Sequence, residues 1–240
     1  MIIDTTFDFR KDSGGRDPDQ HSKTLKRYHK SLWSKHLPSG ELLVLADNVR
    51  TRYLVFNGTE GDHYLTSDSI ANSYSHQRGK IVSVINQIEP ALIEDFRTLN
   101  STIGASILFP GNRIDGQVTI NAQRGFNHYI ADRFDLTLEC IRRHYLHIES
   151  PLSPVLTRYD AFFKLFGDFQ GYVDFFLLND LVNNQYSEVL FFTRDEPLFV
   201  TSPLPKDVSS YLVYREGSMS FVRLRNKRIS KWVATLENRI

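Results

Sequence analysis

Strand-like and helix-like patterns are distributed unevenly along this chain of 240 residues. Short alternating or compact apolar segments fall mostly in the N-terminal half, and segments with apolar residues every three or four positions dominate the C-terminal half. Such a separation favours an α+β fold over alternating α/β units. The expected strands are 2–10, 41–46, 51–56, 63–66, 103–109 and 187–193. The sequence therefore predicts a small antiparallel sheet in the N-terminal half, packed on a mainly helical C-terminal half.

The longest helical pattern lies in the middle of the chain. Apolar residues from Phe126 to Tyr145 form one stripe, so a long central helix is expected there. It is expected to begin near Asn127, because Gly125 weakens a first turn. Further helices are expected from Ser22, a good N-cap, and over 88–99, 153–166, 171–182 and 219–236. We expect a single domain over residues 1–240, with a strand-rich lobe at 1–118 and a helix-rich lobe at 119–240.

The expected C-terminal helix also carries a basic face, opposite its apolar stripe. The basic residues are Arg223, Arg225, Lys227, Arg228 and Lys231. Such a face is usually solvated. It becomes a nucleic-acid contact only where it continues into other positive surface.

Composition excludes several classes of protein. A hydrophobic fraction of 41% is ordinary for a soluble globular chain, and a net charge of +1 does not suit binding of nucleic acid through overall charge. Cys140 is the only cysteine, which excludes an intramolecular disulfide and a multi-cysteine zinc site and predicts a buried thiol. The N-terminus lacks a signal-peptide pattern, and no apolar run approaches the roughly 18 residues of a membrane span. These features predict a soluble, cytoplasmic protein.

Polar side chains crowd the stretch FDFRKDSGGRDPDQHSKTLKRYHKSLWSK, residues 7–35. Neighbouring carboxylates can bind a divalent cation or divide acid and base roles, but no metal-binding motif is present, so the cofactor stays unknown. The Ser13–Arg16 turn offers backbone N–H groups to an anion, although it does not match the nucleotide-binding P-loop. Two interpretations remain open. The stretch is either a solvated arm that caps the next helix or one wall of a polar pocket.

A second polar group lies in QRGFNHYIADRFDLTLECIRRHY, residues 123–145. Arg133 lies beside the apolar stripe, so its guanidinium is expected to be partly buried. A buried arginine needs an acidic partner or an anionic ligand. Asp132 or an acid of the N-terminal arm could provide the partner. A structural ion pair and a contact with substrate both remain open.

Three blocks of the chain are long and distinctive. They are FDFRKDSGGRDPDQHSKTLKRYHKSLWSKHLPSG, TINAQRGFNHYIADRFDLTLECIRRHY and SPLSPVLTRYDAFFKLFGDFQGYVDFFLLNDLV. In these blocks the chain resembles a family of uncharacterised bacterial proteins with no assigned function. The resemblance covers most of the chain and implies one whole family member. It implies no activity and no catalytic residues.

Two functions fit these observations. The first is an enzyme or binding protein for a phosphate-bearing ligand, a nucleotide or nucleic acid, with a defence or toxin-type role. The guanidinium fork suits phosphate, and aromatic rings such as Trp33 can stack on a base. The candidate catalytic residues are Asp17, Asp19 and Asp132, and the candidate ligand-binding residues are Arg10, Arg16, His21, Tyr28, His29, Arg124, Asn127 and Arg133. The second function is a non-catalytic adaptor that forms a homo-oligomer.

Overall fold

The computed structural model describes residues 3–48, 53–59, 61–74, 79, 81–193 and 197–237. Within these residues the strands form one antiparallel sheet in the order β1-β2-β3-β4. The strands are β1 (Ala46–Asp47), β2 (Leu54–Gly58), β3 (Gly61–Ser69) and β4 (Ser106–Pro110). The sheet belongs to the N-terminal half, and the fold is α+β, which confirms the predicted class.

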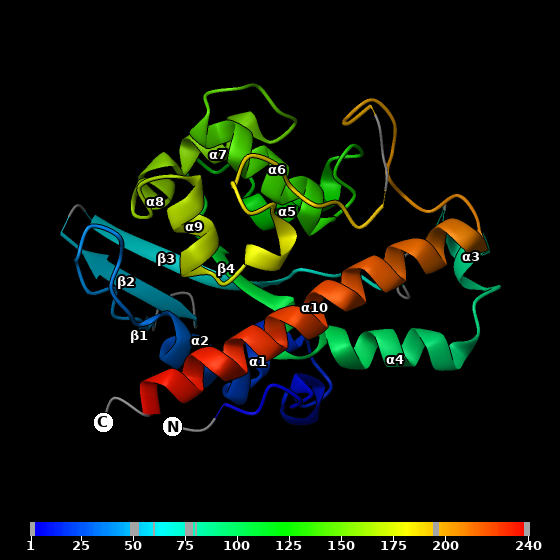
Figure 1. Cartoon of the computed structure of the whole chain (residues 1–240), viewed down its shortest axis with the longest axis horizontal. Coiled ribbons are helices and arrows are strands. Elements are labelled where there is room, and N and C mark those ends of the chain that lie inside the picture. Colours follow the sequence, from blue (N-terminus) through cyan, green and yellow to red (C-terminus); the bar gives the residue numbers. More distant parts are fainter. Residues whose placement is uncertain are drawn as a thin grey trace.

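Helices cover both sides of this sheet. Figure 1 shows α5 to α9 gathered on one side, and α1, α2, α4 and the long α10 on the other. The helices that precede β4 are α1 (Pro18–His21), α2 (Lys23–Trp33), α3 (Val82–Ile85) and α4 (Pro90–Asn100). Those that follow it are α5 (Ile120–Phe126), α6 (Phe134–Tyr145), α7 (Ser153–Arg158), α8 (Asp160–Lys164), α9 (Phe169–Phe175) and α10 (Val208–Glu237). Short 3₁₀ turns occur at η1 (Phe9–Asp12), η2 (Ile103–Ala105) and η3 (Asn179–Leu181).

Strand pairing fixes which residues face each other near the site described below. β2 and β3 form a hairpin in which Leu54 pairs with Leu65 and Gly58 with Gly61, as the alternating pattern predicts. β3 then pairs with β4, so that Ser69 lies opposite Ser106. This register brings the polar end of β3 beside the start of β4, although residues 70–105 separate the two strands along the chain.

One continuous hydrophobic core joins both halves of the chain. Helices α8 and α9 supply a cluster of rings, in which Phe166 lies 5.0 Å from Phe175 and 5.2 Å from Phe176 between centroids. Cys140 is buried in this core, as predicted. No described helix combines the length and the apolar character that a membrane crossing needs.

The predicted N-terminal strand is wrong over its described residues, 3–10. The chain instead turns into η1, because the Asp8 side chain accepts a hydrogen bond from the Arg10 backbone N–H at 3.0 Å and caps the turn. The Phe9 amide bonds Ser101 at the end of α4 rather than a neighbouring strand. A short polar side chain has therefore outweighed an alternating apolar pattern.

The predicted central helix is wrong as one element, because α5 ends at Phe126 and α6 begins at Phe134. Asn127 bonds the Tyr129 backbone N–H with its side chain at 3.0 Å. Ala131 and Asp132 then adopt left-handed backbone conformations, with φ of 47° and 61°. These two residues reverse the chain, and the longest helix of the described residues is α10 instead.

Several further segments differ from expectation. Residues 187–193 form no strand, since the Asn183 side chain accepts from the Ser187 N–H and leaves only an isolated bridge between Val182 and Val189. The predicted helix 153–166 breaks at Tyr159, and 171–182 begins earlier and breaks after Phe175. The predicted strand 41–46 reduces to β1, and the first two residues of 51–56 lie outside the described part of the chain.

The basic face of α10 is also not uniformly solvated. Arg225 is fully buried, with its guanidinium donating to the backbone carbonyls of Phe176, Gly104 and Ser106. Arg228 pairs with Asp180 at 2.8 Å. The helix is covered on more sides than its apolar stripe indicates, so the predicted basic face is divided between core and surface.

Candidate functional site

Helix α1 is a single turn that the local sequence specifies. The Asp17 side chain accepts from the Asp19 backbone N–H at 3.1 Å, and Pro18 occupies the first turn, where its missing N–H costs little. Ser22 ends α1 and caps α2 by accepting from the Leu25 N–H, as predicted. The helix packs on β3. Asp17 and Asp19 are therefore held against the sheet rather than in a free arm.

One side of α1 lines an acidic cleft of about 390 Å³. Its lining includes four carboxylates, those of Asp17, Asp19, Asp68 and Asp132. Asp19 comes from α1, Asp68 from β3 and Asp132 from the left-handed turn before α6. All three residues predicted as catalytic thus lie in one cleft, together with a fourth acid that the sequence reasoning did not select.

Two carboxyl groups in this cleft, those of Asp19 and Asp68, have a raised pKa. Burial, followed by the charges of Asp68 and Asp17, raises the pKa of Asp19 to about 7. Burial also raises the pKa of Asp68 to about 6, although the Arg124 guanidinium opposes this effect. Asp19 therefore changes its charge near neutral pH, as a group that gives and takes protons must do.

Arg124 is fully buried and contacts two of the acids that line the cleft. It forms an ion pair with Asp68, lies 3.6 Å from a carboxylate oxygen of Asp132, and donates to Thr137 Oγ1 at 2.9 Å. Because its N–H groups already donate to protein oxygens, we expect Arg124 to fix the positions of Asp68 and Asp132 rather than to bind a ligand directly. Of the two candidate ligand-binding arginines in residues 123–145, Arg124 is the one that contacts acids of the cleft.

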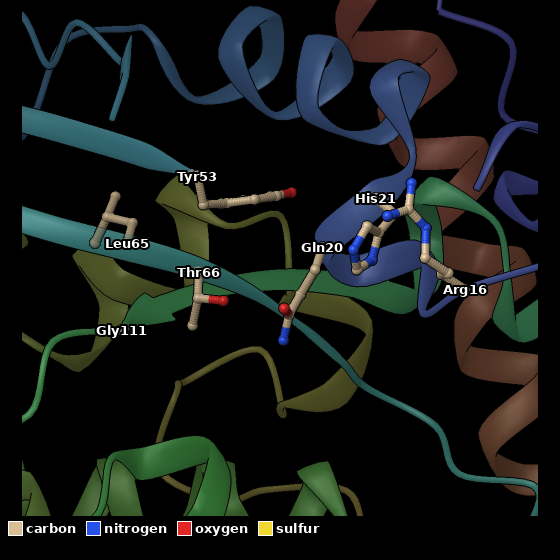
Figure 2. A pocket seen from close by; sticks show the side chains of 7 residues that line it. All are labelled: Arg16, Gln20, His21, Tyr53, Leu65, Thr66 and Gly111. Atoms are coloured by element: carbon tan, nitrogen blue, oxygen red, sulfur yellow. The ribbon is translucent and has the colours of Figure 1, made fainter. Parts of the chain in front are cut away.

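The other side of α1 lines a second cavity of about 520 Å³, here called the Arg16 cavity. Its lining residues are Arg16, Gln20, His21, Tyr53, Leu65, Thr66 and Gly111, and Figure 2 shows the side chains that enter it. His21 Nδ1 lies 3.1 Å from the Asp17 carbonyl oxygen, which can only accept, so Nδ1 carries hydrogen and Nε2 is left for another partner. Arg16 is exposed and forms no ion pair with another described residue.

Tyr53 supplies an unusual polar group to the Arg16 cavity. Its residue is 4% exposed, and its hydroxyl lies near that of Ser67 but forms no hydrogen bond of standard geometry with a described residue. Figure 2 shows this hydroxyl pointing toward the side of the cavity where Gln20 and His21 lie. A buried hydroxyl without a partner costs free energy unless a ligand or water satisfies it. The position is therefore a candidate contact for a bound molecule.

The remaining predicted ligand-binding residues lie outside the Arg16 cavity. Arg10 lines the acidic cleft but is occupied by Asp8 and Glu94, at 2.6 and 2.8 Å. Tyr28 and His29 are buried in the core. Asn127 binds the Pro151 carbonyl. The structure gives the positions of these residues, and their roles stay predictions.

Arg133 lies apart from the acidic cleft. Its guanidinium is buried against Asp135, donates to Thr193 Oγ1 at 2.7 Å, and lies 5.7 Å from the ring centre of Tyr214. The ion pair that the sequence offered as one of two interpretations is therefore present. Its acidic partner is Asp135 rather than Asp132.

The sequence reasoning missed Asp68, Ser67 and Tyr53. The available signal was the run TSDS at 66–69, in which polar residues continue directly from an expected strand. Strand pairing places that run beside β4, and the packing of α1 on β3 places it beside the acids of α1. Across the described part of the chain, no group of three or more His, Cys, Asp or Glu side chains is arranged to hold a metal ion.

Comparisons with known proteins place the chain in a family without adding an activity. Searches of curated proteins and of solved structures found no significant match. A sequence profile matches residues 3–229, which is nearly the whole chain. The chain belongs to DUF6994, a family of unknown function.

Proposed function

We propose that this protein binds a phosphate-bearing ligand of nucleotide size at α1 and uses Asp19 as the acid–base group. The observation that carries the proposal is the position of α1 between two cavities. One side of this turn presents Arg16, Gln20 and His21, and the other presents Asp17 and Asp19. A ligand held by Arg16, Gln20 and His21 would lie close to Asp19, whose carboxyl group titrates near neutral pH.

The Arg16 cavity offers the groups that an anion needs. The Arg16 guanidinium presents parallel N–H donors, which suit phosphate oxygens. Gln20 and the unpartnered hydroxyl of Tyr53 add further donors along the same cavity, and the bare Nε2 of His21 would accept a hydrogen bond from a ligand hydroxyl. Its volume of about 520 Å³ is in the range of small-molecule sites. These features support a phosphate group in this cavity rather than in the acidic cleft.

The acidic cleft would hold the neutral or reacting part of the ligand. Four carboxylates repel a phosphate, so the negative end of a ligand is expected to turn toward Arg16. Asp19 in its ionised form would accept a proton from a ligand hydroxyl or a water molecule, and in its protonated form would return it. A net charge of +1 and this acidic cleft favour a free nucleotide over a long nucleic acid. A defence or toxin-type role stays a prediction from the sequence.

The test is a panel of ligands on the purified chain, measured by isothermal calorimetry and thermal shift. The panel contains inorganic phosphate, AMP, ADP, ATP and a short single-stranded RNA, each with and without Mg²⁺ or Mn²⁺. We expect a mononucleotide to bind, and Arg16→Ala to weaken binding roughly tenfold or more, as loss of a charged hydrogen bond does. Arg223→Ala is the matched control, because Arg223 is on α10 and lines neither cavity.

Absence of binding by every ligand of the panel would contradict the proposal. Equal weakening by Arg16→Ala and Arg223→Ala would contradict the assigned site. The same samples address the alternative of a non-catalytic homo-oligomer, which stays a prediction from the sequence. A stable oligomer by light scattering, together with no ligand binding, would favour that alternative.

A further inference from the structure

A chain of hydrogen bonds runs from the core to the acidic cleft. Trp33 Nε1 donates to His29 Nδ1 at 2.9 Å, and His29 Nε2 lies 3.0 Å from Ser106 Oγ. Ser106 Oγ lies 2.8 Å from Ser67 Oγ, which donates to Asp19 Oδ1 at 2.8 Å. Trp33, His29, Ser67 and Ser106 are all buried. The four bonds connect α2, β4, β3 and α1.

Chemistry fixes the direction of the bonds in this chain while Asp19 is ionised. An indole N–H can only donate, so His29 Nδ1 must accept and Nε2 must carry the ring proton. An ionised carboxylate can only accept, so Ser67 donates to Asp19 Oδ1 and Ser106 must then donate to Ser67. The Nε2–H group of His29 faces this serine pair, with Nε2 3.0 Å from Ser106 Oγ and 3.3 Å from Ser67 Oγ.

His29 cannot reverse the chain by taking a second proton. Burial, together with the positive charge of Arg225, lowers the pKa of His29 to about 3. Arg225 is itself anchored beneath β4, where it donates to the Ser106 carbonyl at 2.7 Å. The other aromatic group against the imidazole is the ring of Tyr53, 6.3 Å away between centroids. The neutral Nε2–H form of His29 is therefore the one that this environment accepts.

We propose that His29, Ser106 and Ser67 are positioning residues that hold Asp19 Oδ1 as a hydrogen-bond acceptor and leave Oδ2 as the oxygen that exchanges a proton with the ligand. This inference rests on the proposed acid–base role of Asp19. It assigns the reacting atom within that residue. It also gives the buried His29 a role that does not require contact with the ligand.

Two measurements on the ligand-free protein test the chain. The first is ¹⁵N NMR of the His29 ring, in which we expect a protonated Nε2, a bare Nδ1 and no titration between about pH 5 and 8. The second is the pKa of Asp19 followed by ¹³C NMR of its carboxyl carbon. Ser67→Ala removes a donor to the ionised form, so the pKa of Asp19 should rise by roughly half to one unit. Ser69→Ala is the matched control, because the Ser69 hydroxyl donates to the Ala71 carbonyl and not to Asp19.

The outcomes separate the chain from the proposed function. A His29 ring protonated at Nδ1, or one that titrates near neutral pH, would overturn the chain even if the Ser67 variant failed to fold. An unchanged Asp19 pKa in folded Ser67→Ala would overturn the positioning role. If both measurements succeed and the nucleotide panel shows no binding, the hydrogen-bond chain stands and the proposed function fails.

Discussion

The Ser67 hydroxyl donates to Asp19 Oδ1 across 2.8 Å and thereby joins strand β3 to helix α1. This bond stabilises the ionised form of a carboxyl group that burial and two neighbouring acids push toward the protonated form. The balance leaves the pKa of Asp19 at about 7. A group in this state connects the stability of the fold with the chemistry of the site.

Replacing Asp19 by asparagine should stabilise the protein more at pH 8 than at pH 5. The folded-state pKa of about 7 lies above the ordinary value of 3.8, so the folded chain binds more protons than the unfolded chain between these limits. The stability that Asp19 contributes is therefore complete below about pH 3.8 and is lost as the pH rises through 7. Asparagine resembles the protonated form and cannot ionise, so it avoids this loss.

The expected gain at pH 8 is an increase in Tm of roughly 2–4 °C, the shift that about 1 kcal/mol causes in a domain of this size. Thermal unfolding by circular dichroism at both pH values measures it. Asp17→Asn is a suitable control, because Asp17 is exposed on the same turn. A gain for Asp19→Asn that did not change with pH would contradict the raised pKa.

A second prediction concerns Lys35, which enters a cavity beside α9. Its ammonium group donates to the Phe175 carbonyl at 2.5 Å and lies 4.5 to 5.1 Å from the ring centres of Trp33, Phe175 and Trp232. Burial, followed by the charge of Arg225, lowers the pKa of Lys35 to about 7. We expect acylation of Lys35 by a small reagent to follow a pH profile with a midpoint near 7.

Peptide mapping by mass spectrometry measures this profile residue by residue. Lys227, which is exposed on α10, provides the internal reference. Asp174→Asn should move the Lys35 midpoint lower still, because the Asp174 charge raises this pKa. A Lys35 midpoint equal to that of Lys227 would refute the prediction.

A local signal in the sequence predicted the Ser22 cap correctly. This cap depends on a bond across three residues, which a sequence displays directly. The broken central helix is different. The apolar stripe continues from Ile130 to Phe134 as if the helix were unbroken, but between them Ala131 and Asp132 adopt left-handed backbone conformations. Periodicity reports burial of a face, and it does not report a reversal of the chain.

Long-range pairings account for what the sequence could not provide. Asp132 is adjacent to Arg133 but lies against Arg124, and Arg133 instead pairs with Asp135. Asp19 meets Ser67 only because α1 packs on β3, 48 residues further along the chain. A single sequence contains the groups for these contacts but neither the strand register nor the helix packing that selects among them.

Two glycines should respond to alanine in opposite directions. A Cβ at Gly217 of α10 would lie 2.5 Å from the Phe192 carbonyl oxygen, so Gly217→Ala must displace backbone and should cost about 1–3 kcal/mol. A Cβ at Gly125 of α5 meets nothing within 4 Å, so Gly125→Ala should stabilise the protein by up to about 1 kcal/mol. Urea unfolding of both variants compares them. Equal effects of the two changes would show that α10 does not pack closely on residue 192.

The Arg133–Asp135 pair should behave as a structural ion pair. Arg133→Met leaves Asp135 buried without its partner and should cost about 3–5 kcal/mol, a loss that urea unfolding would measure. The double variant Arg133→Met with Asp135→Leu should recover part of that loss. Ligand affinity of the folded variants should stay unchanged, because neither residue lines the two cavities beside α1. A loss of affinity at unchanged stability would instead favour a ligand-facing role for Arg133.

Tyr53→Phe separates function from stability most directly. The Tyr53 hydroxyl is buried without a described partner, so its removal should leave Tm unchanged or slightly higher. If the hydroxyl contacts a bound phosphate, the same change should weaken binding roughly tenfold, the effect of one hydrogen bond to a charged group. Calorimetry with the best mononucleotide of the panel measures the affinity, and Tyr64→Phe serves as control, because Tyr64 lies on β3 outside the cavity lining. A large drop in Tm would show that the hydroxyl is satisfied within the ligand-free fold, whereas unchanged affinity would remove Tyr53 from the site.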